Sequence, residues 1–152
     1  HVDAAKGMVA QAKENAALSG LSEAPIRYIV DDCKKFVERE IKRGNKYDGI
    51  IMDPPSYGRG PSGEVWKIEE CIDEFVRLAV NVLSDKPLFF LLNSYTTGLS
   101  PLAMSYIVNL RLASKFGGKT EAGELALPVT QTNGFLPCGA SVRWSATGAS
   151  EK

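Results

Sequence analysis

The chain has 152 residues, 44% of them hydrophobic, and its 18 Lys and Arg residues balance 18 Asp and Glu residues. This length suits one compact domain, while the neutral charge gives no support for a phosphate-binding surface. No stretch approaches the roughly 18 apolar residues of a membrane helix. Cys33, Cys71 and Cys138 form no CxxC pair, which argues against a zinc site or a disulfide framework and predicts a cytoplasmic location.

Helical and strand-like segments alternate along the chain. Hydrophobic spacing, capping residues and the positions of glycine and proline define them. The predicted helices cover 4–19, the segment from the Asp31-Asp32 cap to Gly44, 65–83 and 101–116. The predicted strands cover 26–30, 47–52, 87–92, 121–129 and 138–145, with Val2-Asp3 as the end of another. Thr132-Asn133-Gly134 predicts a turn between the last two strands.

This alternation predicts an α/β fold with a mostly parallel sheet, helices on both faces and a closing antiparallel hairpin. The apolar strands at 47–52 and 87–92 are expected to be buried. We assign residues 1–146 to one domain and residues 147–152 to a C-terminal tail.

Acidic residues follow three of the predicted strands: Asp3, Asp31-Asp32 and Asp53. Ligands of open parallel sheets bind outside the carboxyl ends of the strands. Carboxylates there suit a ligand with hydroxyl and amino groups, such as an adenosine. The alternative for Asp3 and Asp31 is that they only cap the helices that follow.

The segment Asp53-Pro54-Pro55-Ser56-Tyr57 ends an apolar run abruptly. Its two prolines remove two backbone donors and fix φ near about −65°, so the strand has a rigid exit. Rigidity keeps a carboxylate and carbonyl groups aimed at a ligand. Tyr57 offers a flat ring on which a base could stack.

Two neighbouring features allow more than one interpretation. The glycine-rich stretch 58–63 lacks the Lys-Ser/Thr of a P-loop, so we interpret it as a flexible cover over a base pocket, with Arg59 as a candidate phosphate contact. Trp66 could stack on a substrate, although packing at the start of the next helix is favoured.

The segment 53–57 resembles the [D/N]-P-P-[Y/F] motif of class I S-adenosylmethionine-dependent methyltransferases that modify planar nitrogen atoms. Leu127-Pro128 and 136–140, with Arg143-Trp144, resemble the closing hairpin of the 23S rRNA methyltransferase group. The opening segment 2–6 is similar to that group's second strand and its ribose-binding acid. The resemblance covers nearly the whole chain in the family's order, and implies a Rossmann-like fold and S-adenosyl-L-methionine as cofactor.

The resemblance also implies roles for individual residues. Asp3 would hold the ribose hydroxyls, and Asp32 or Asp31 would accept from the adenine amino group. The implied cofactor contacts are Asp3, Ala4, Asp31, Asp32, Cys33 and Asp53. The implied catalytic residues are Asp53, Pro54, Pro55 and Tyr57, and the implied substrate contacts are Ser56, Tyr57, Arg59 and Asn93.

The chain departs from the family's pattern in two places. The first strand and its glycine-rich loop are missing, so the chain is expected to be a partial catalytic domain that starts at strand two. Relatives that methylate carbon 5 of cytosine carry a cysteine nucleophile where this chain has Asn93-Ser94-Tyr95. Cys71 and Cys138 lie elsewhere and are expected to be plain buried cysteines. The sequence therefore favours methylation of a nitrogen.

The resulting hypothesis is N-methylation of a base in rRNA, with RNA held partly by a separate N-terminal domain not present in this chain. A protein glutamine amide is a rival substrate, because it is also planar. A nicotinamide-dependent oxidoreductase shares the sheet and the ribose-binding acid, although the chain has no Tyr-x-x-x-Lys pair. A non-catalytic fragment is the remaining alternative.

Overall fold

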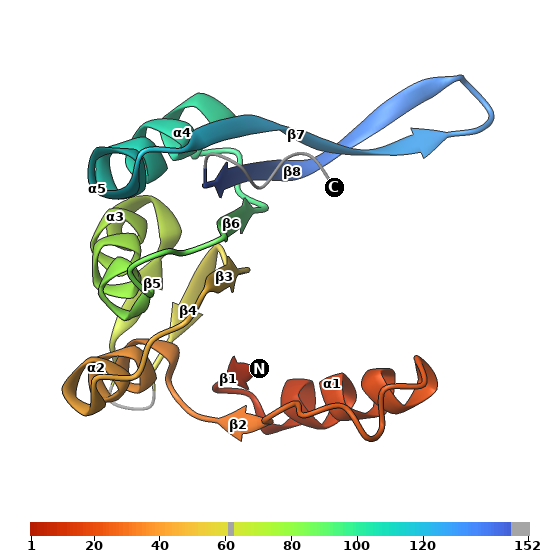
Figure 1. The fold of residues 1–152 in the computed structure, drawn as a ribbon. Coiled ribbons are helices and arrows are strands. Elements are labelled where there is room, and N and C mark those ends of the chain that lie inside the picture. Colours follow the sequence, from red (N-terminus) through yellow and green to blue (C-terminus); the bar gives the residue numbers. More distant parts are fainter. Residues whose placement is uncertain (61–62, 147–152) are drawn as a thin grey trace. The chain divides into compact units, whose positions relative to one another are not determined.

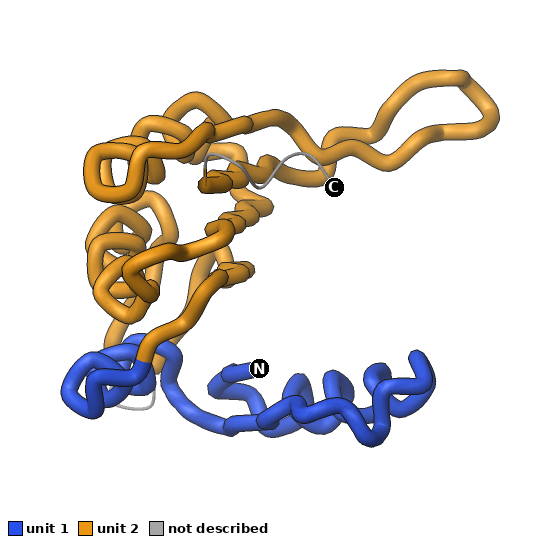
Figure 2. The backbone as a smooth tube through the Cα atoms, viewed as in Figure 1, with its two compact units in different colours: residues 1–45 blue, residues 46–152 orange. Residues whose placement is uncertain are grey.

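The structure is a computed structural model that describes residues 1–60 and 63–146. Helices and strands follow one another in the α/β order that the sequence predicts (Figure 1). The chain divides into two compact units, residues 1–45 and residues 46–152 (Figure 2). The predicted tail at 147–152 lies outside the described residues.

The first unit contains two short parallel strands and two helices. Its elements are β1 (Val2–Asp3), α1 (Lys6–Leu18), β2 (Ile29–Val30) and α2 (Cys33–Arg43). The strand predicted at 26–30 is therefore shorter than expected, because β1 offers only two residues to pair with. Helix α2 has the predicted caps: the Asp32 side chain accepts from the backbone N–H of Lys35, and Gly44 ends the helix at a φ of 72°.

The second unit is built on a four-stranded mixed sheet in the order β3-β6-β8-β7. Strands β3 and β6 are parallel, and β8 runs antiparallel to both of its neighbours. The strands of this sheet are β3 (Gly49–Met52), β6 (Phe89–Ser94), β7 (Lys119–Val129) and β8 (Gly134–Ser145). The other elements are β4 (Tyr57–Arg59), β5 (Val65–Lys67), α3 (Ile68–Ala79), a 3-10 turn (Val80–Val82), α4 (Pro101–Val108), a π-helical turn (Asn109–Ala113) and α5 (Ser114–Phe116).

The hydrophobic core of the second unit lies between the sheet and the helices α3 and α4 (Figure 1). Helix α3 contributes apolar residues at helical spacing, whereas β6 and β8 contribute alternate residues. The core includes Ile68, Ile72, Val76, Phe90, Leu92, Met104, Val108, Val142 and Trp144. The two helices thus cover one face of the sheet, and the residues after the carboxyl ends of β3 and β6 lie in loops.

Two expectations about the second unit are wrong. The strands at 47–52 and 87–92 are not buried on both faces: Ile51 is 67% exposed and Phe89 is 36% exposed. The reason is that α3 and α4 pack on the face that carries Phe90 and Leu92. The helix predicted at 65–83 begins only at Ile68, because Val65–Lys67 pairs antiparallel with β4 as a short hairpin.

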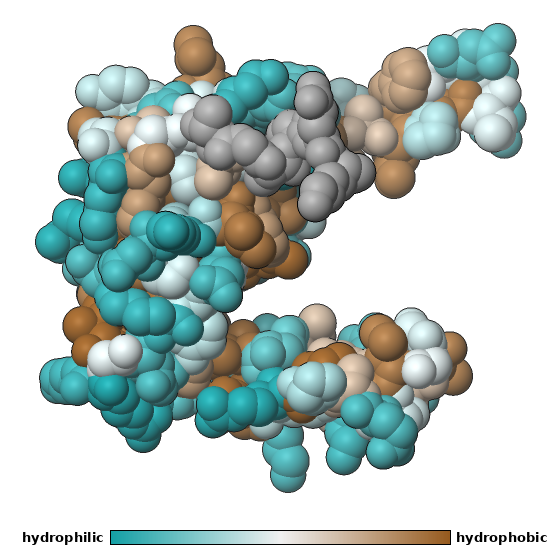
Figure 3. Space-filling view, in the orientation of Figure 1, coloured by the Kyte–Doolittle hydropathy of each residue, from teal (hydrophilic) through white to brown (hydrophobic). Residues whose placement is uncertain are grey.

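The closing antiparallel hairpin is confirmed and is longer than predicted. Asn133 has a φ of 54° in the turn, and the Gly134 backbone N–H donates to the Thr132 hydroxyl at 3.3 Å. The hairpin extends beyond the rest of its sheet (Figure 1). Hydrophobic residues occupy part of its surface (Figure 3), where Leu127 and Phe135 are exposed.

Candidate functional site

The acids of the first unit meet where the parallel strands β1 and β2 end. Asp3 pairs with Val30, and the backbone N–H of Asp31 donates to the Asp3 carbonyl oxygen at 3.0 Å. One Asp3 carboxylate oxygen accepts from the backbone N–H of Ala5 at 2.7 Å, across the exposed Ala4. Asp3 thus supports the start of α1, and its second carboxylate oxygen leaves further acceptor capacity.

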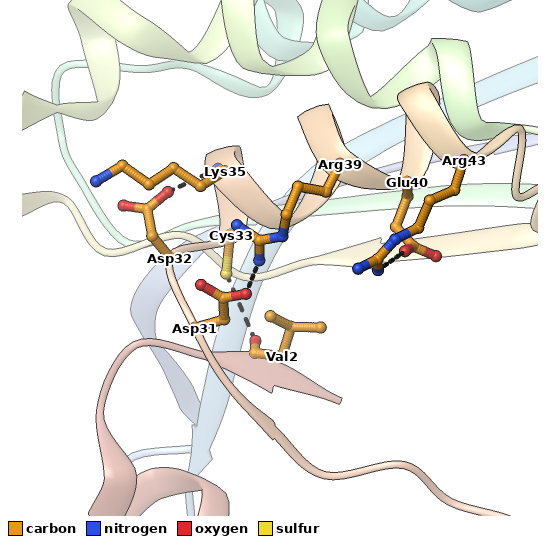
Figure 4. Close-up of polar contacts among 8 residues, drawn as sticks. All are labelled: Val2, Asp31, Asp32, Cys33, Lys35, Arg39, Glu40 and Arg43. Atoms are coloured by element: carbon orange, nitrogen blue, oxygen red, sulfur yellow. Dashed lines mark hydrogen bonds and ion pairs between the residues drawn. The ribbon is translucent and has the colours of Figure 1, made fainter.

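Asp31 and Asp32 have different partners, as Figure 4 shows. Asp31 forms an ion pair with Arg39 of α2. Asp32 is the N-cap of α2, and its carboxylate accepts from the Lys35 backbone N–H at 2.8 Å. The capping interpretation of Asp31 is therefore wrong, because Arg39 holds its carboxylate and Asp32 takes the cap position.

Cys33 lies between these acids at the start of α2. Its thiol donates a hydrogen bond to the Val2 carbonyl oxygen at 3.5 Å (Figure 4). Burial raises the pKa of the Cys33 thiol, and the carboxylates of Asp3 and Asp32 raise it further. The side chain is therefore a neutral thiol at physiological pH, suited to contact and unsuited to nucleophilic attack.

In the second unit, the segment 53–57 leaves β3 as an anchored loop. Asp53 is exposed directly after the strand, whereas Pro54 is buried. The Trp66 Nε1–H donates to the Pro55 carbonyl oxygen at 2.6 Å, and the Ile68 backbone N–H donates to the Ser56 carbonyl oxygen at 3.1 Å. Two neighbouring elements, β5 and α3, therefore hold the loop that presents Asp53.

Tyr57 and Arg59 are neighbours on one face of strand β4. The Tyr57 side chain is 52% exposed, and its hydroxyl accepts a hydrogen bond from the Arg59 Nε–H at 2.9 Å. The expected flexible cover at 58–63 is wrong for Gly58 and Arg59, because they pair with Trp66 and Val65. Pro61 and Ser62 of that stretch lie outside the described residues.

Trp66 packs at the start of α3, as the favoured interpretation predicts. Its ring meets Phe75 edge-on, with ring centroids 5.8 Å apart and planes at 84°. The ring contact holds β5 against α3, and the hydrogen bond to Pro55 joins β5 to the loop 53–57.

The end of β6 adds a residue that the sequence reasoning missed. Asn93 is half-buried and pairs with Ser141 of β8. Tyr95 is exposed just after the strand, where partial burial and then the Asp53 carboxylate raise the pKa of its hydroxyl. The signal was available, since Tyr95 follows β6 as Asp53 follows its parallel neighbour β3. Beyond Tyr95, the Thr96 hydroxyl donates to a Glu69 carboxylate oxygen at 2.6 Å and fixes the loop to α3.

The cysteines of the second unit differ in exposure. Cys71 is half-buried in α3, but Cys138 is exposed on β8 and lies close enough to Tyr95 to act on its pKa. The expectation of two plain buried cysteines is therefore wrong for Cys138, because the extended hairpin leaves this part of β8 uncovered.

The predicted site residues are thus divided between the two units. Asp3, Asp31, Asp32 and Cys33 meet in the first unit, and 53–57, Arg59 and Asn93 belong to the second. Among residues 1–60 and 63–146, no group of three His, Cys, Asp or Glu residues could hold a metal ion. No helix within the same described ranges is long and apolar enough to cross a membrane.

The chain is similar to known methyltransferases. No family model matches it. A crystal structure of a SAM-dependent methyltransferase from Agrobacterium tumefaciens is 37% identical, with a TM-score of 0.85 over 95% of this chain and 48% of that one. A structure of another methyltransferase in complex with SAH is 19% identical, with a TM-score of 0.66 over 94% of this chain and 38% of that one.

Over shorter stretches, the chain is also similar in sequence to proteins named ribosomal RNA large subunit methyltransferase I. The protein of Klebsiella pneumoniae (strain 342) is 32% identical over 56 residues, and that of Erwinia tasmaniensis is 36% identical over 56 residues. Each match covers 37% of this chain and 14% of the relative. The chain thus spans about half of the Agrobacterium protein and a smaller part of these relatives. The comparisons confirm the predicted resemblance and the Rossmann-like methyltransferase fold.

Proposed function

We propose that this chain forms part of the catalytic domain of an S-adenosylmethionine-dependent methyltransferase that methylates a nitrogen of a base in rRNA. The observation that carries the proposal is the anchored loop that presents Asp53 at the carboxyl end of β3. The likeness to the Agrobacterium protein, which extends over 95% of the chain, supports the same reaction class.

The acids of the first unit are suited to hold the cofactor. Asp3 and Asp32 each use a carboxylate oxygen to accept from a backbone N–H, and a carboxylate has further lone pairs for ribose hydroxyls or an adenine amino group. Asp31 is less available, because it is paired with Arg39. We therefore assign the ribose to Asp3, the adenine amino group to Asp32, and a contact with the adenine ring to Cys33.

Asp53 and the Pro54 carbonyl oxygen act on the target nitrogen. When bound, S-adenosylmethionine would supply the methyl group to the nitrogen lone pair and leave as S-adenosylhomocysteine, and the Asp53 carboxylate would accept the proton that the nitrogen releases. Acceptors for the amine hydrogens turn the lone pair toward the methyl group and stabilise the positive charge that develops. Tyr57 exposes a ring that can fix the plane of the base.

The nitrogen assignment rests on the residues that follow β6. Carbon 5 of cytosine becomes nucleophilic only after covalent attack at carbon 6, whereas a nitrogen has its own lone pair. Strand β6 ends at Ser94 and is followed by Tyr95 and Thr96, so no cysteine follows this strand in the sequence, and the nearby Cys138 belongs to β8. Asn93 and Arg59 are the remaining proposed substrate contacts in this unit.

Transfer of a labelled methyl group tests the proposed function. The full-length protein is incubated with methyl-labelled S-adenosylmethionine and either an unmodified transcript of large-subunit rRNA or a glutamine-containing peptide. We expect label in the RNA and none in the peptide. Label in the peptide alone would replace the RNA substrate with a protein amide. Displacement of S-adenosylmethionine by NADH, with no transfer to either acceptor, would favour an oxidoreductase.

A further inference from the structure

The short hairpin of β4 and β5 has two different faces. In an antiparallel pair, residues directly opposite each other share a face, and so do residues two positions apart on one strand. The register of this hairpin therefore divides its residues into two sets. Gly58 and Trp66 form one face. The other, which we call the outer face, consists of Tyr57, Arg59, Val65 and Lys67.

The contacts of Trp66 show which face points inward. Its ring packs edge-on against Phe75 of α3, and its Nε1–H donates to the Pro55 carbonyl oxygen at 2.6 Å. The outer face therefore points away from α3. All four of its residues are exposed, with Tyr57 at 52% and Val65 at 49%. This face is thus open to a binding partner.

Two cationic side chains lie beside the Tyr57 ring on the outer face. Lys67 is directly across the hairpin, where Cβ atoms are typically about 5 Å apart. Arg59 is two positions along the same strand, at a spacing of roughly 7 Å. The paired residues 57–59 and 65–67 include no acid. The outer face therefore combines an exposed aromatic ring with positive charge on two sides of it.

Both cations keep donors for a further partner. Arg59 uses its Nε–H for the Tyr57 hydroxyl at 2.9 Å, and its two Nη groups hold the other guanidinium donors. Lys67 donates to the Glu70 carboxylate at 2.8 Å, and this bond and the charge of Glu70 raise the pKa of Lys67, so it stays a cation. The two side chains are 51% and 66% exposed, and an exposed ion pair of this kind is weak. A phosphate can therefore share or replace Glu70.

We propose that the outer face binds the backbone of a nucleic acid around the target nucleotide, with Tyr57 under the base and Arg59 and Lys67 on the phosphates at its two sides. This inference rests on the proposed function and adds Lys67 as a residue that selects the substrate class. A nucleotide within a strand has a phosphate on each side, whereas a glutamine side chain has none. A stacking ring with cations for the backbone is a general way to bind a single strand.

The salt dependence of binding tests the two cations. A fluorescein-labelled single-stranded fragment of the large-subunit rRNA transcript is titrated with the full-length protein, without S-adenosylmethionine, and fluorescence anisotropy gives the association constant. Each phosphate contact contributes about −0.7 to the slope of its logarithm against the logarithm of salt concentration. Arg59→Gln and Lys67→Gln should each make the slope shallower by about 0.7, and weaken binding about fivefold at roughly 0.1 M salt. Lys119 has the same kind of exposed ion pair, with Glu121 at 2.8 Å, so Lys119→Gln is the matched control and should change neither quantity.

Two further variants separate the contributions within the outer face. Glu70→Gln removes the partner of Lys67 and should tighten binding, by up to about fivefold. This is a gain that damage to the hairpin would not produce. Tyr57→Leu should weaken binding with an unchanged salt slope, because stacking releases no counterions. Unchanged slopes in both Arg59→Gln and Lys67→Gln, or weaker binding in Glu70→Gln, would overturn the proposal.

An acidic peptide is the rival partner for two cations, so labelled polyglutamate is titrated in the same way. Binding of polyglutamate with no binding of the RNA fragment would overturn the assignment to a nucleic acid. RNA binding with the expected slopes, but without methyl transfer by the wild type, would overturn the proposed function and support the outer face. Methyl transfer to the rRNA transcript with unchanged slopes would overturn the outer face alone.

Discussion

The Trp66 Nε1–H donates a hydrogen bond to the Pro55 carbonyl oxygen at 2.6 Å and so connects β5 to the loop that carries Asp53. The same indole packs edge-on against Phe75 of α3. A residue from outside the Asp-Pro-Pro segment therefore contributes to its rigidity, in addition to the two prolines.

Trp66→Phe should keep most of the packing and lose the hydrogen bond to Pro55. We expect the free energy of unfolding to fall by about 0.5–1.5 kcal/mol, the net value of one hydrogen bond, and kcat to fall as the Asp53 loop loosens. Phe75→Leu is the matched control: it weakens the ring contact but leaves the hydrogen bond, so stability should fall without the loss of kcat. Urea denaturation and methyl-transfer assays measure the two effects. Equal kcat values in Trp66→Phe and Phe75→Leu would contradict a role for the bond.

Asp53→Ala should lower kcat by about 10²–10³, the scale of one preorganised electrostatic group. The physical reason is that the variant removes the acceptor for the hydrogen of the target amine. Asp48 precedes the same strand and accepts from the Ser84 hydroxyl at 2.7 Å, so Asp48→Ala is a matched control that should keep wild-type kcat. Single-turnover transfer to the rRNA transcript gives the comparison. Activity lost equally in both variants would point to damage to β3 instead of lost chemistry.

Asp3→Asn separates the cofactor role of Asp3 from its structural one. The amide oxygen can still accept from the Ala5 backbone N–H, whereas the amide nitrogen cannot accept from a ribose hydroxyl. We therefore expect stability close to wild type and a loss of S-adenosylmethionine affinity of about 1–3 kcal/mol. Isothermal titration calorimetry measures the affinity for S-adenosylmethionine, with Glu14→Gln on the exposed side of α1 as the control. Unchanged affinity in Asp3→Asn would remove Asp3 from the cofactor site.

Asp73 and Arg111 should make stability depend on pH. Arg111 donates two hydrogen bonds to the Asp73 carboxylate, at 2.9 and 2.6 Å, and these hold the pKa of Asp73 below its usual value near 3.8. Because the folded pKa is lowered, the pair stabilises the fold above pH 3.8 and loses this contribution as pH falls through the folded pKa. Asp73 is 48% exposed, so the contribution should be below about 1 kcal/mol.

Urea denaturation of wild type and Asp73→Asn at pH 7 and at pH 2.5 measures this contribution. The difference in the free energy of unfolding should be present at pH 7 and shrink at pH 2.5. A difference that is the same at both pH values would show that the carboxylate charge has no part in it.

The sequence predicted much of the fold because its local signals agree with its packing. Asp32 and Gly44 cap α2 as expected, and Asn133 forms the turn of the closing hairpin. The predictions failed where tertiary context decides the outcome. The burial of Ile51 depends on which helices cover its face, and the pairing of Val65–Lys67 with β4 depends on a partner across a glycine-rich stretch.

In the candidate site, too, local sequence signals could be predicted and tertiary contacts could not. The motif at 53–57 could be recognised because its residues are adjacent in the sequence. The hydrogen bond that joins Pro55 to Trp66 could not, because it depends on how the loop after β3 and strand β5 are arranged. Cys138 was misjudged for a related reason: the sequence identified its strand and did not show that this part of the hairpin is uncovered.

The central claim is that the methyl group is transferred to a nitrogen without a cysteine nucleophile. The most direct test is mass spectrometry of the nucleosides from rRNA that the full-length protein has methylated, for wild type and for the variant in which Cys33, Cys71 and Cys138 are all changed to serine. We predict an N-methylated nucleoside from both proteins at similar rates, because no covalent intermediate is needed. A 5-methylcytosine product, or activity abolished by Cys138→Ser alone with the fold intact, would contradict the account.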